Sequence, residues 1–235
     1  MKALLEIDPR NFDERQLSEK EILQWFDLCD AVWLHDGDST KPHAELISGM
    51  CSDGYFDCSR VLCYPNITEI LARQLVQKLR LESTFRMKEV DWVVGSAYAA
   101  ITFSYEVAKA LGAIHGFTEK EPTDLKGKIM VWRRQTIPAR SQILQIEELI
   151  TTAHTMNEVG RAVKEGNSEL VNFMPIVGAL IHRPPVLPVD YGDTEVVALI
   201  EKEVWTVNPK DCHLCQAGSP RYRPKTHWQE LTGKK

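Results

Sequence analysis

The chain has 235 residues, 43% hydrophobic and 26% charged, which is enough for one good-sized hydrophobic core or two small ones. Its formal net charge of −5 gives no indication of a nucleic-acid or anionic-membrane partner. No apolar run is long enough to cross a bilayer, and the N-terminal sequence MKALLEIDPRNFDERQ lacks the pattern of a secretory signal. We therefore expect a cytoplasmic protein without a membrane partner, whose six cysteines are free thiols.

The first part of the sequence predicts two helices separated by short strands and loops. Ser18–Glu21 form a capping box ahead of apolar residues at helical spacing, so we expect a helix over 18–34. The turn-rich stretch 35–61 predicts short strands and loops. A second helix is expected over 66–81, with Asn66 as its cap, because its apolar residues share one face.

The rest of the sequence alternates strands and helices. The stretch 92–117 predicts a strand, a glycine-containing turn, a helix and a second strand, which together make a βαβ unit. Further elements are expected, namely a helix over 155–165 and strands within 129–133, 143–146, 170–181 and 195–207. This alternation favours an α/β fold with a mainly parallel sheet and flanking helices. Ligands bind such sheets at the carboxyl ends of the strands.

The stretch SQILQIEELITTAHT, residues 141–155, places two acids after an expected strand and threonines where a helix should begin. Loop and helix N–H groups would bind a phosphate there, and the threonine hydroxyls would add donors. Glu147 and Glu148 would repel that phosphate, so they suit sugar hydroxyls or a cation. The two halves predict a ribose 5-phosphate site. A strand-to-helix loop with solvated acids and a threonine cap is the alternative interpretation.

Six segments, judged together by their order and spacing along the chain, resemble one enzyme family. They are ILQIEELITTAHT, VDWVVGSAYAAITFSYEVAKALG, LISGMCSDGYFDCSRV, MVWRRQTI, GALIHR and CHLCQAGSPRYRPK. The first resembles the phosphoribosyl pyrophosphate motif of the type I phosphoribosyltransferases, and the set resembles the orotate phosphoribosyltransferases. The resemblance spans about residues 44–225 and implies one domain over 1–235. Within it we expect a Rossmann-like core of about 66–183 and a small hood from about 1–65 and 184–235.

The resemblance implies transfer of ribose 5-phosphate from phosphoribosyl pyrophosphate to orotate, which gives orotidine 5′-monophosphate and pyrophosphate in pyrimidine synthesis. The catalytic residues would be Glu147, Glu148 and Lys120. The phosphates would be bound by Gly95, Ser96, Ala97, Tyr98, Arg133, Arg134, Thr151, Thr152, Ala153, His154 and Thr155. Orotate would be bound by Tyr55, Phe56, Thr151 and Arg183. Mg²⁺ is the implied cofactor, and a homodimer the implied assembly.

Most of these residues also have a purely structural interpretation. The two aromatics could be core residues, and the Arg133–Arg134 pair could be a solvated strand end. Lys120 lies in a charged stretch that on its own suggests a solvated loop. Arg183 precedes two prolines and could simply close a strand. Their functional roles therefore follow from the resemblance and not from spacing.

The sequence departs from the family pattern at both phosphate loops. Glu148 replaces an aspartate, Ala153–His154 replaces a glycine pair, and Ala99–Ala100 stands where a glycine is usual. Alanine at a position with positive φ costs about 1–2 kcal/mol, whereas at negative φ the cost vanishes. Two rivals to the orotate enzyme thus stay open: a related enzyme with another base specificity, and a nucleotide-binding regulatory protein with weakened catalysis.

The pair Cys212 and Cys215 invites a metal interpretation, because C-x-x-C supplies two zinc ligands. Structural zinc usually needs four ligands. Cys51, Cys58, Cys63 or His213 could complete the set only if the fold brought them together. From the sequence we expect no protein-bound metal site.

Overall fold

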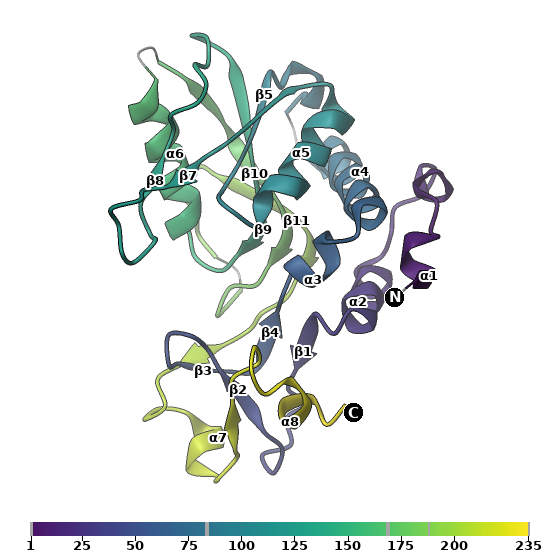
Figure 1. Cartoon of the computed structure of the whole chain (residues 1–235), viewed down its shortest axis with the longest axis vertical. Helices are drawn as coiled ribbons and strands as arrows, with labels where there is room; N and C mark the ends of the chain where they lie inside the picture. The colour runs from purple at the N-terminus through teal and green to yellow at the C-terminus, as the bar shows by residue number, and fades with distance from the viewer. Residues whose placement is uncertain (1, 83–84, 168–169, 188, 235) are drawn as a thin grey trace.

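A five-stranded parallel sheet forms the centre of the molecule (Figure 1). The computed structural model describes residues 2–82, 85–167, 170–187 and 189–234. The strand order is β11-β10-β9-β5-β6, and every neighbouring pair is parallel. The strands are β5 (Trp92–Gly95), β6 (Ile114–Phe117), β9 (Gln142–Ile150), β10 (Asn172–His182) and β11 (Glu195–Glu201). The expected mainly parallel α/β sheet is confirmed.

The βαβ unit expected over 92–117 is present. Strand β5 leads into helix α5 (Ala100–Leu111), and β6 then returns parallel to β5. The helix ends at Gly112, which has a φ of 72°, a left-handed conformation that glycine adopts without a steric penalty. The unit places the loop between β5 and α5 at the carboxyl edge of the sheet.

Helices cover both faces of this sheet. Helices α4 (Pro65–Glu82) and α5 pack on one face, where Val93 belongs to their hydrophobic cluster. Helix α6 (His154–Gly166) packs on the other, in a cluster that contains Trp92. Successive residues of β5 thus point to opposite faces, as strand geometry requires. The strands are apolar on both sides because both sides are covered.

The two helices predicted in the first part of the chain differ from the structure at their ends. Helix α2 (Glu19–Leu28) has the expected capping box but stops well before residue 34. Asp30 has a φ of 52°, which breaks the helix and turns the chain into strand β1 (Val32–Leu34). Helix α4 forms as expected, but Asn66 does not cap it. The Asn66 amide donates instead to the backbone carbonyls of Leu4 and Ile7.

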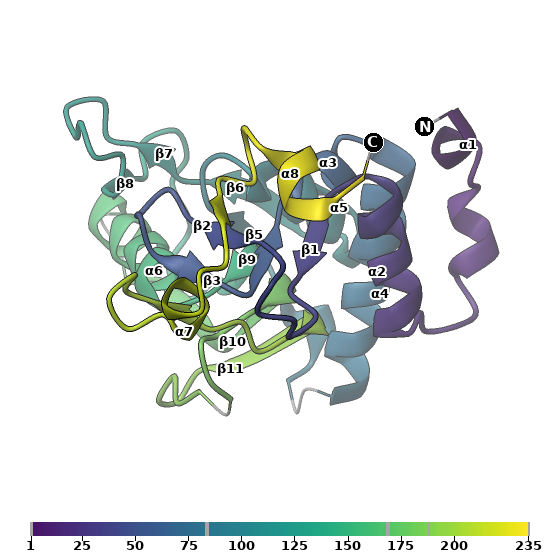
Figure 2. The ribbon, with the colours of Figure 1, turned by 90° about the horizontal axis from the view of Figure 1, so that it is seen from below.

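A second, smaller sheet combines segments from both ends of the chain (Figures 1 and 2). Its order is β12-β3-β2-β13, with β2 (His43–Glu45), β3 (Cys51–Ser52), β12 (Thr206–Val207) and β13 (Arg221–Tyr222). Strand β4 (Gly54–Phe56) pairs with β1 beside it. The remaining helices are α1 (Lys2–Leu5), η1 (Pro9–Phe12), α3 (Ser59–Leu62), η2 (Met87–Glu89), α7 (His213–Gln216) and α8 (Trp228–Thr232). The expected small hood is therefore present.

The expected boundaries of core and hood stay a prediction. Ile22 and Phe26 of α2 belong to the same hydrophobic cluster as α4, so this part of the segment 1–65 packs with the core. Among the described residues, no helix is both long and apolar enough to cross a membrane.

Three expected strands need correction. The segment 129–133 contributes only β8 (Met130–Val131), which pairs with β7 (Glu119–Lys120) outside the main sheet. Strand β9 continues beyond residue 146 to Ile150, because its hydrogen-bonded pairing with β10 continues that far. The segment 195–207 is divided between β11 and β12, which belong to different sheets.

Candidate active site

The two acids Glu147 and Glu148 lie within the last part of β9, and not after it as the sequence predicted. Side chains alternate along a strand, so the two carboxyl groups leave β9 on opposite faces. The Glu147 side chain is 1% exposed, whereas Glu148 is half-buried. The acids therefore occupy two different environments at the carboxyl edge of the sheet.

The Glu147 carboxylate is held by two side chains. Ser96 Oγ donates to its Oε2 at 2.5 Å, and Gln145 Nε2 donates to its Oε1 at 2.7 Å. Burial raises the pKa of Glu147 to about 7, and the negative charge of Glu148 adds to the rise, while the two hydrogen bonds oppose it. Glu147 thus gains or loses a proton close to neutral pH.

Burial also raises the pKa of Glu148. Half-buried Lys120, on β7, lies close enough for its positive charge to lower the pKa of both Glu147 and Glu148. The structure therefore brings together the three residues that the sequence predicted as catalytic. A carboxylate oxygen is a hard ligand of the kind that magnesium prefers, and half-buried Glu148 is the member of the pair whose oxygens are not already held by Ser96 or Gln145.

The loop after β5 approaches this pair from the neighbouring strand. Gly95 is required there, because a Cβ would lie 2.2 Å from Ser104 Oγ on α5. Ser96 and Ala97 are buried, and the peptide bond between Ala97 and Tyr98 is cis. The Tyr98 side chain is 73% exposed. Through the hydrogen bond from Ser96, this loop is connected to Glu147.

The loop after β9, Thr151–Ala153, leads into α6. Thr152, His154 and Thr155 are exposed, and the N-cap residue of the helix, Ala153, makes no side-chain capping hydrogen bond. The free N–H groups of a helix N-terminus bind anions. Ala153 has a φ of −68° and Ala99 a φ of −69°. Neither alanine is strained, so the departures from the glycine pattern carry no conformational cost in this structure.

Arg183 directly follows β10, and its backbone N–H donates to the Ile150 carbonyl at 2.8 Å. Its Nε is buried and has no hydrogen-bond partner among the described residues. Burial lowers the pKa of this guanidinium, while Cys58 and Tyr55 oppose that effect. The Cys58 thiol, whose charge affects the pKa of Arg183, donates to the backbone carbonyl of Glu148 at 3.5 Å. A buried donor without a partner suits a negatively charged ligand.

Tyr55 and Phe56 do not share a surface, since they are successive residues of β4. Tyr55 is half-buried, and the positive charge of Arg183 affects its pKa, which burial raises. Phe56 is 6% exposed and packs edge-on against Phe26, with ring centres 6.1 Å apart. The expectation that both rings flank a base is corrected, because Phe56 has the contacts of a core residue.

Arg133 and Arg134 follow β8 and are exposed. Arg133 forms a 2.6 Å ion pair with Glu121, and Arg134 pairs with Glu119. Their charges are therefore already matched by neighbouring carboxylates on and next to β7. No described contact joins either arginine to the acid pair or to the two phosphate loops.

Two residues of the site were missed by the sequence analysis. Gln145 is buried and hydrogen-bonded to Glu147, and its position two residues earlier on the same strand face was the available signal. Thr118 is fully buried, and its Oγ1 has no hydrogen-bond partner among the described residues. Its N–H donates to the Gly95 carbonyl at 3.1 Å, so it lies beside the β5 loop. No sequence pattern indicated Thr118.

Comparison with known proteins identifies the family, although no protein-family model matches the chain. Two orotate phosphoribosyltransferases, from Pelotomaculum thermopropionicum and Desulforamulus reducens, are 32% and 33% identical to it over 194 and 193 residues. The alignments cover 83% and 82% of this chain and 94% and 93% of those relatives. The chain belongs to the orotate phosphoribosyltransferase family.

Solved structures share the fold of this family member. The orotate phosphoribosyltransferase of Aeropyrum pernix matches with a TM-score of 0.54 at 14% identity, over 77% of this chain and 93% of that one. The UMP synthase of Leishmania donovani matches with a TM-score of 0.52 at 16% identity, over 77% of this chain. The matched part is 36% of that longer protein.

Proposed function

We propose that the protein is an orotate phosphoribosyltransferase, which transfers ribose 5-phosphate from phosphoribosyl pyrophosphate to a ring nitrogen of orotate and releases pyrophosphate. The observation that carries this proposal is Arg183, whose buried Nε has no hydrogen-bond partner in the part of the chain that the structure describes and which follows the strand beside β9. A planar guanidinium forms two parallel hydrogen bonds with a carboxylate. Orotate has a carboxylate, whereas uracil and hypoxanthine do not, so this donor favours orotate among planar bases.

Glu148 would accept hydrogen bonds from the ribose hydroxyls, and Glu147 would act from the buried side of the same strand end. Bond cleavage at the anomeric carbon leaves positive charge on the sugar, and negative charge close by stabilises that transition state more than the ground state. Glu148 is half-buried and suits this contact, while Glu147 is already held by Ser96 and Gln145. Glu147 would then fix the position of the strand end and contribute charge once it is ionised.

The two loops would bind the phosphates. The uncapped start of α6 and the threonines before it suit the 5′-phosphate, and the loop Gly95–Tyr98 suits the pyrophosphate. Lys120 would neutralise charge on the departing pyrophosphate. Arg133 and Arg134 would have to exchange Glu121 and Glu119 for a phosphate before they took part. When bound with the substrate, Mg²⁺ would neutralise the pyrophosphate oxygens, and the carboxylate of half-buried Glu148 would be the protein group that suits such an ion.

Tyr55 is the remaining aromatic candidate for contact with the base. It is half-buried, and its phenol is close enough to Arg183 for the two groups to affect each other's pKa. A flat conjugated ring packs well against an aromatic face. Tyr55 and Arg183 would therefore contact the ring and the carboxylate of orotate, respectively.

We also propose a homodimer in the cytoplasm. Strand β6 is an edge of the main sheet, its first residue Ile114 is 56% exposed, and Tyr105 on the adjacent helix α5 is 54% exposed. Exposed large apolar side chains near a sheet edge favour a protein contact. Light scattering should give twice the chain mass of 26.8 kDa. A mass that stays at the monomer value at high concentration would contradict the dimer.

The regulatory alternative rested on the altered glycine positions. Since Ala99 and Ala153 have negative φ, that support is weakened. The deciding experiment follows the loss of orotate absorbance with phosphoribosyl pyrophosphate and Mg²⁺, with uracil and hypoxanthine in parallel reactions. Turnover with orotate alone is the expected result. Turnover with another base, or binding of orotidine monophosphate without any turnover, would overturn the proposal.

Arg183→Ala tests the residue that carries the specificity. We expect KM for orotate to rise far more than KM for phosphoribosyl pyrophosphate, because only the base would lose a charged partner. Arg10→Ala is the matched control, since Arg10 is exposed and paired with Asp8. Equal increases in both KM values would remove Arg183 from base recognition while leaving the family assignment intact.

A further inference from the structure

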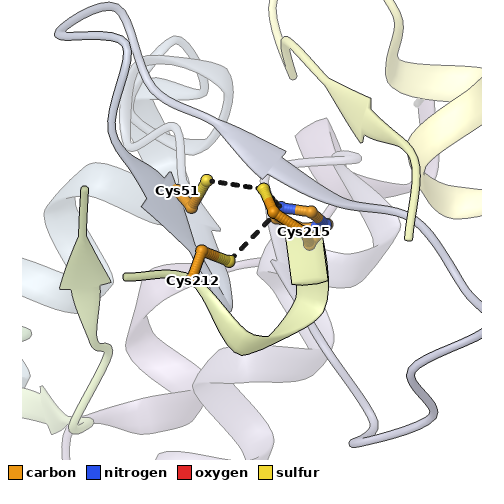
Figure 3. A group of neighbouring side chains, drawn as sticks. Cys51, Cys212 and Cys215 are labelled. Atoms are coloured by element: carbon orange, nitrogen blue, oxygen red, sulfur yellow. Dashed lines mark hydrogen bonds between the residues drawn. The ribbon is translucent and has the colours of Figure 1, made fainter. Parts of the chain in front are cut away.

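Four metal-binding side chains meet in the small sheet, far from one another in the sequence. They are His43 on β2, Cys51 on β3, and Cys212 and Cys215 at the start of and within α7. Their ligand atoms all lie within 4.8 Å of one another. Figure 3 shows the three cysteines directing their sulfur atoms toward a common point. The Cys212–Cys215 pair, for which the sequence showed no further ligands, thus lies next to His43 and Cys51 of the β2–β3 hairpin.

The spacing of these atoms matches a tetrahedral zinc site. Cys51 Sγ lies 3.5 Å from Cys215 Sγ, and His43 Nε2 lies 3.4 Å from Cys215 Sγ and 3.6 Å from Cys212 Sγ. Bonds of about 2.3 Å to sulfur and 2.0 Å to nitrogen would separate tetrahedral ligands by roughly 3.5–3.8 Å. The side chains therefore need little movement to surround one ion.

The His43 ring is oriented as a metal ligand requires. Its Nδ1 lies 2.7 Å from Ser219 Oγ, and that hydroxyl donates its own hydrogen to the Lys41 carbonyl at 2.6 Å. Since the hydroxyl hydrogen is used, Nδ1 must be the donor, and Nε2 faces the sulfurs with a lone pair. Metal-bound histidines typically have their other ring nitrogen held in this way.

The surroundings also fit a charged metal cluster. Three thiolates, one neutral histidine and Zn²⁺ carry a net charge of −1, and Arg221 Nη1 lies 3.9 Å from Cys51 Sγ. His43, Cys51 and Cys212 are fully buried. The hydrophobic cluster around them is small, with Leu214 as its main aliphatic member. A small sheet with so little apolar core is the kind of structure that a metal stabilises.

A disulfide explains this arrangement less well. The sulfurs of Cys51 and Cys215 are well beyond the length of a disulfide bond, which is about 2.05 Å. A disulfide between Cys51 and Cys215 would also not explain why Cys212 Sγ and His43 Nε2 lie in the same cluster. A tetrahedral S₃N set is typical of zinc, whereas hard ions such as magnesium prefer oxygen.

We propose that His43, Cys51, Cys212 and Cys215 bind one structural Zn²⁺ ion, which fastens the β2–β3 hairpin to the C-terminal segment. As zinc binds, the three thiols release their protons to solvent and His43 binds through its neutral Nε2. All four positions are filled by protein, so the ion has no open position for a substrate and serves stability.

The first test is metal analysis of the full-length protein, purified without a metal-affinity step. We expect one zinc per chain in the wild type and close to none in Cys212→Ser or in His43→Ala. Cys63→Ser is the matched control, since Cys63 is exposed and outside the cluster, and it should keep its zinc. A wild type without zinc, with another metal in its place, or with a disulfide among these cysteines would overturn the proposal.

The second test does not depend on variants that fold poorly. Cobalt(II) exchanged into the wild-type protein should give the intense thiolate-to-cobalt absorption of a tetrahedral site, and a chelator should lower its melting temperature. Addition of zinc should reverse the shift. An octahedral cobalt spectrum, or a melting temperature that the chelator does not change, would contradict the site independently of the enzyme's activity.

Discussion

Ser96 Oγ donates a 2.5 Å hydrogen bond to Glu147 Oε2, and this bond connects the loop after β5 to the acid pair on β9. The bond lowers the pKa of Glu147, against the larger opposite effect of burial. In Ser96→Ala the pKa should rise further, so the ionised form appears only at higher pH. We expect kcat/KM for phosphoribosyl pyrophosphate to fall most at about pH 6 and least at about pH 9.

The measurement is a pH–rate profile of both proteins. Loss of one hydrogen bond to a buried charged group corresponds to about 1.5–3 kcal/mol, or about ten- to a hundredfold in rate at the acidic end. Ser104→Ala is the control, because that buried serine bonds the Ile101 carbonyl and His115 instead. A loss that is the same at every pH would refute a role through the ionisation of Glu147.

Glu147→Gln should stabilise the free protein at high pH. Burial favours the protonated form, so the carboxyl contributes its full stability below the unfolded pKa of 4.5 and loses it as pH rises through about 7. Above that range the ionised carboxylate destabilises the fold by about 3 kcal/mol. An amide has no such ionisation, so urea unfolding should show the variant gaining stability at about pH 8 and little at about pH 4.5.

Glu165→Gln is the matched control for that experiment. Glu165 is exposed at the end of α6, where it pairs with Arg161. Removing an exposed ion pair changes stability by less than about 1 kcal/mol. If Glu147→Gln showed the same small effect at both pH values, the raised pKa of Glu147 would be wrong.

Gly95→Ala should disturb the end of β5. The added Cβ would lie 2.2 Å from Ser104 Oγ and 3.3 Å from the Ala100 carbonyl, so either α5 or the loop must move. Overpacking of this kind costs about 1–3 kcal/mol of unfolding free energy. We also expect a higher KM for phosphoribosyl pyrophosphate, because Ser96 is the next residue.

Gly160→Ala provides the opposite control. No described atom outside its own stretch of helix α6 lies within 4 Å of the position its Cβ would take. Alanine in a helix interior is favoured over glycine by up to about 1 kcal/mol, so this variant should be more stable. Equal stability of Gly95→Ala and the wild type in urea would show that the β5–α5 contact gives way easily.

Arg183→Met should separate function from stability. The wild-type protein buries the Arg183 Nε, which finds no partner among the residues that the structure describes, and such a group costs about 1–3 kcal/mol in the absence of ligand. Methionine covers the same surface without that cost, so the melting temperature of the free protein should rise while turnover of orotate falls sharply. Arg10→Met should change neither. A destabilised Arg183→Met variant would mean that the guanidinium has a structural partner.

The sequence predicted the main elements well where hydrophobic periodicity was strong. Helix α4 and the unit β5–α5–β6 lie close to their expected positions because their apolar faces match one period throughout. The prediction was wrong at the ends of elements that are set by tertiary contacts. The end of α2 depends on the left-handed Asp30, and the length of β9 depends on hydrogen bonds to β10.

The candidate site was predicted in its residue types more than in its geometry. Motif similarity placed Glu147, Glu148 and Arg183 at one edge of the sheet. It could not reveal that Phe56 faces the core, since that depends on which side of β4 is covered. The exposed ion pairs of Arg133 and Arg134 also depend on the β7–β8 ribbon, which local sequence does not specify.

The small sheet has a consequence for the order of folding during synthesis. Strands β2 and β3 pair with β13 and β12, and His43 meets Cys212 across 169 positions of the chain. Contacts of such long range form slowly and late, because a large loop must close first. The strands of the parallel sheet, the last of which ends at Glu201, are all synthesised before β12 and β13 of the small sheet. The N-terminal hairpin, though made early, must wait for residues 206–222 before it has its neighbours.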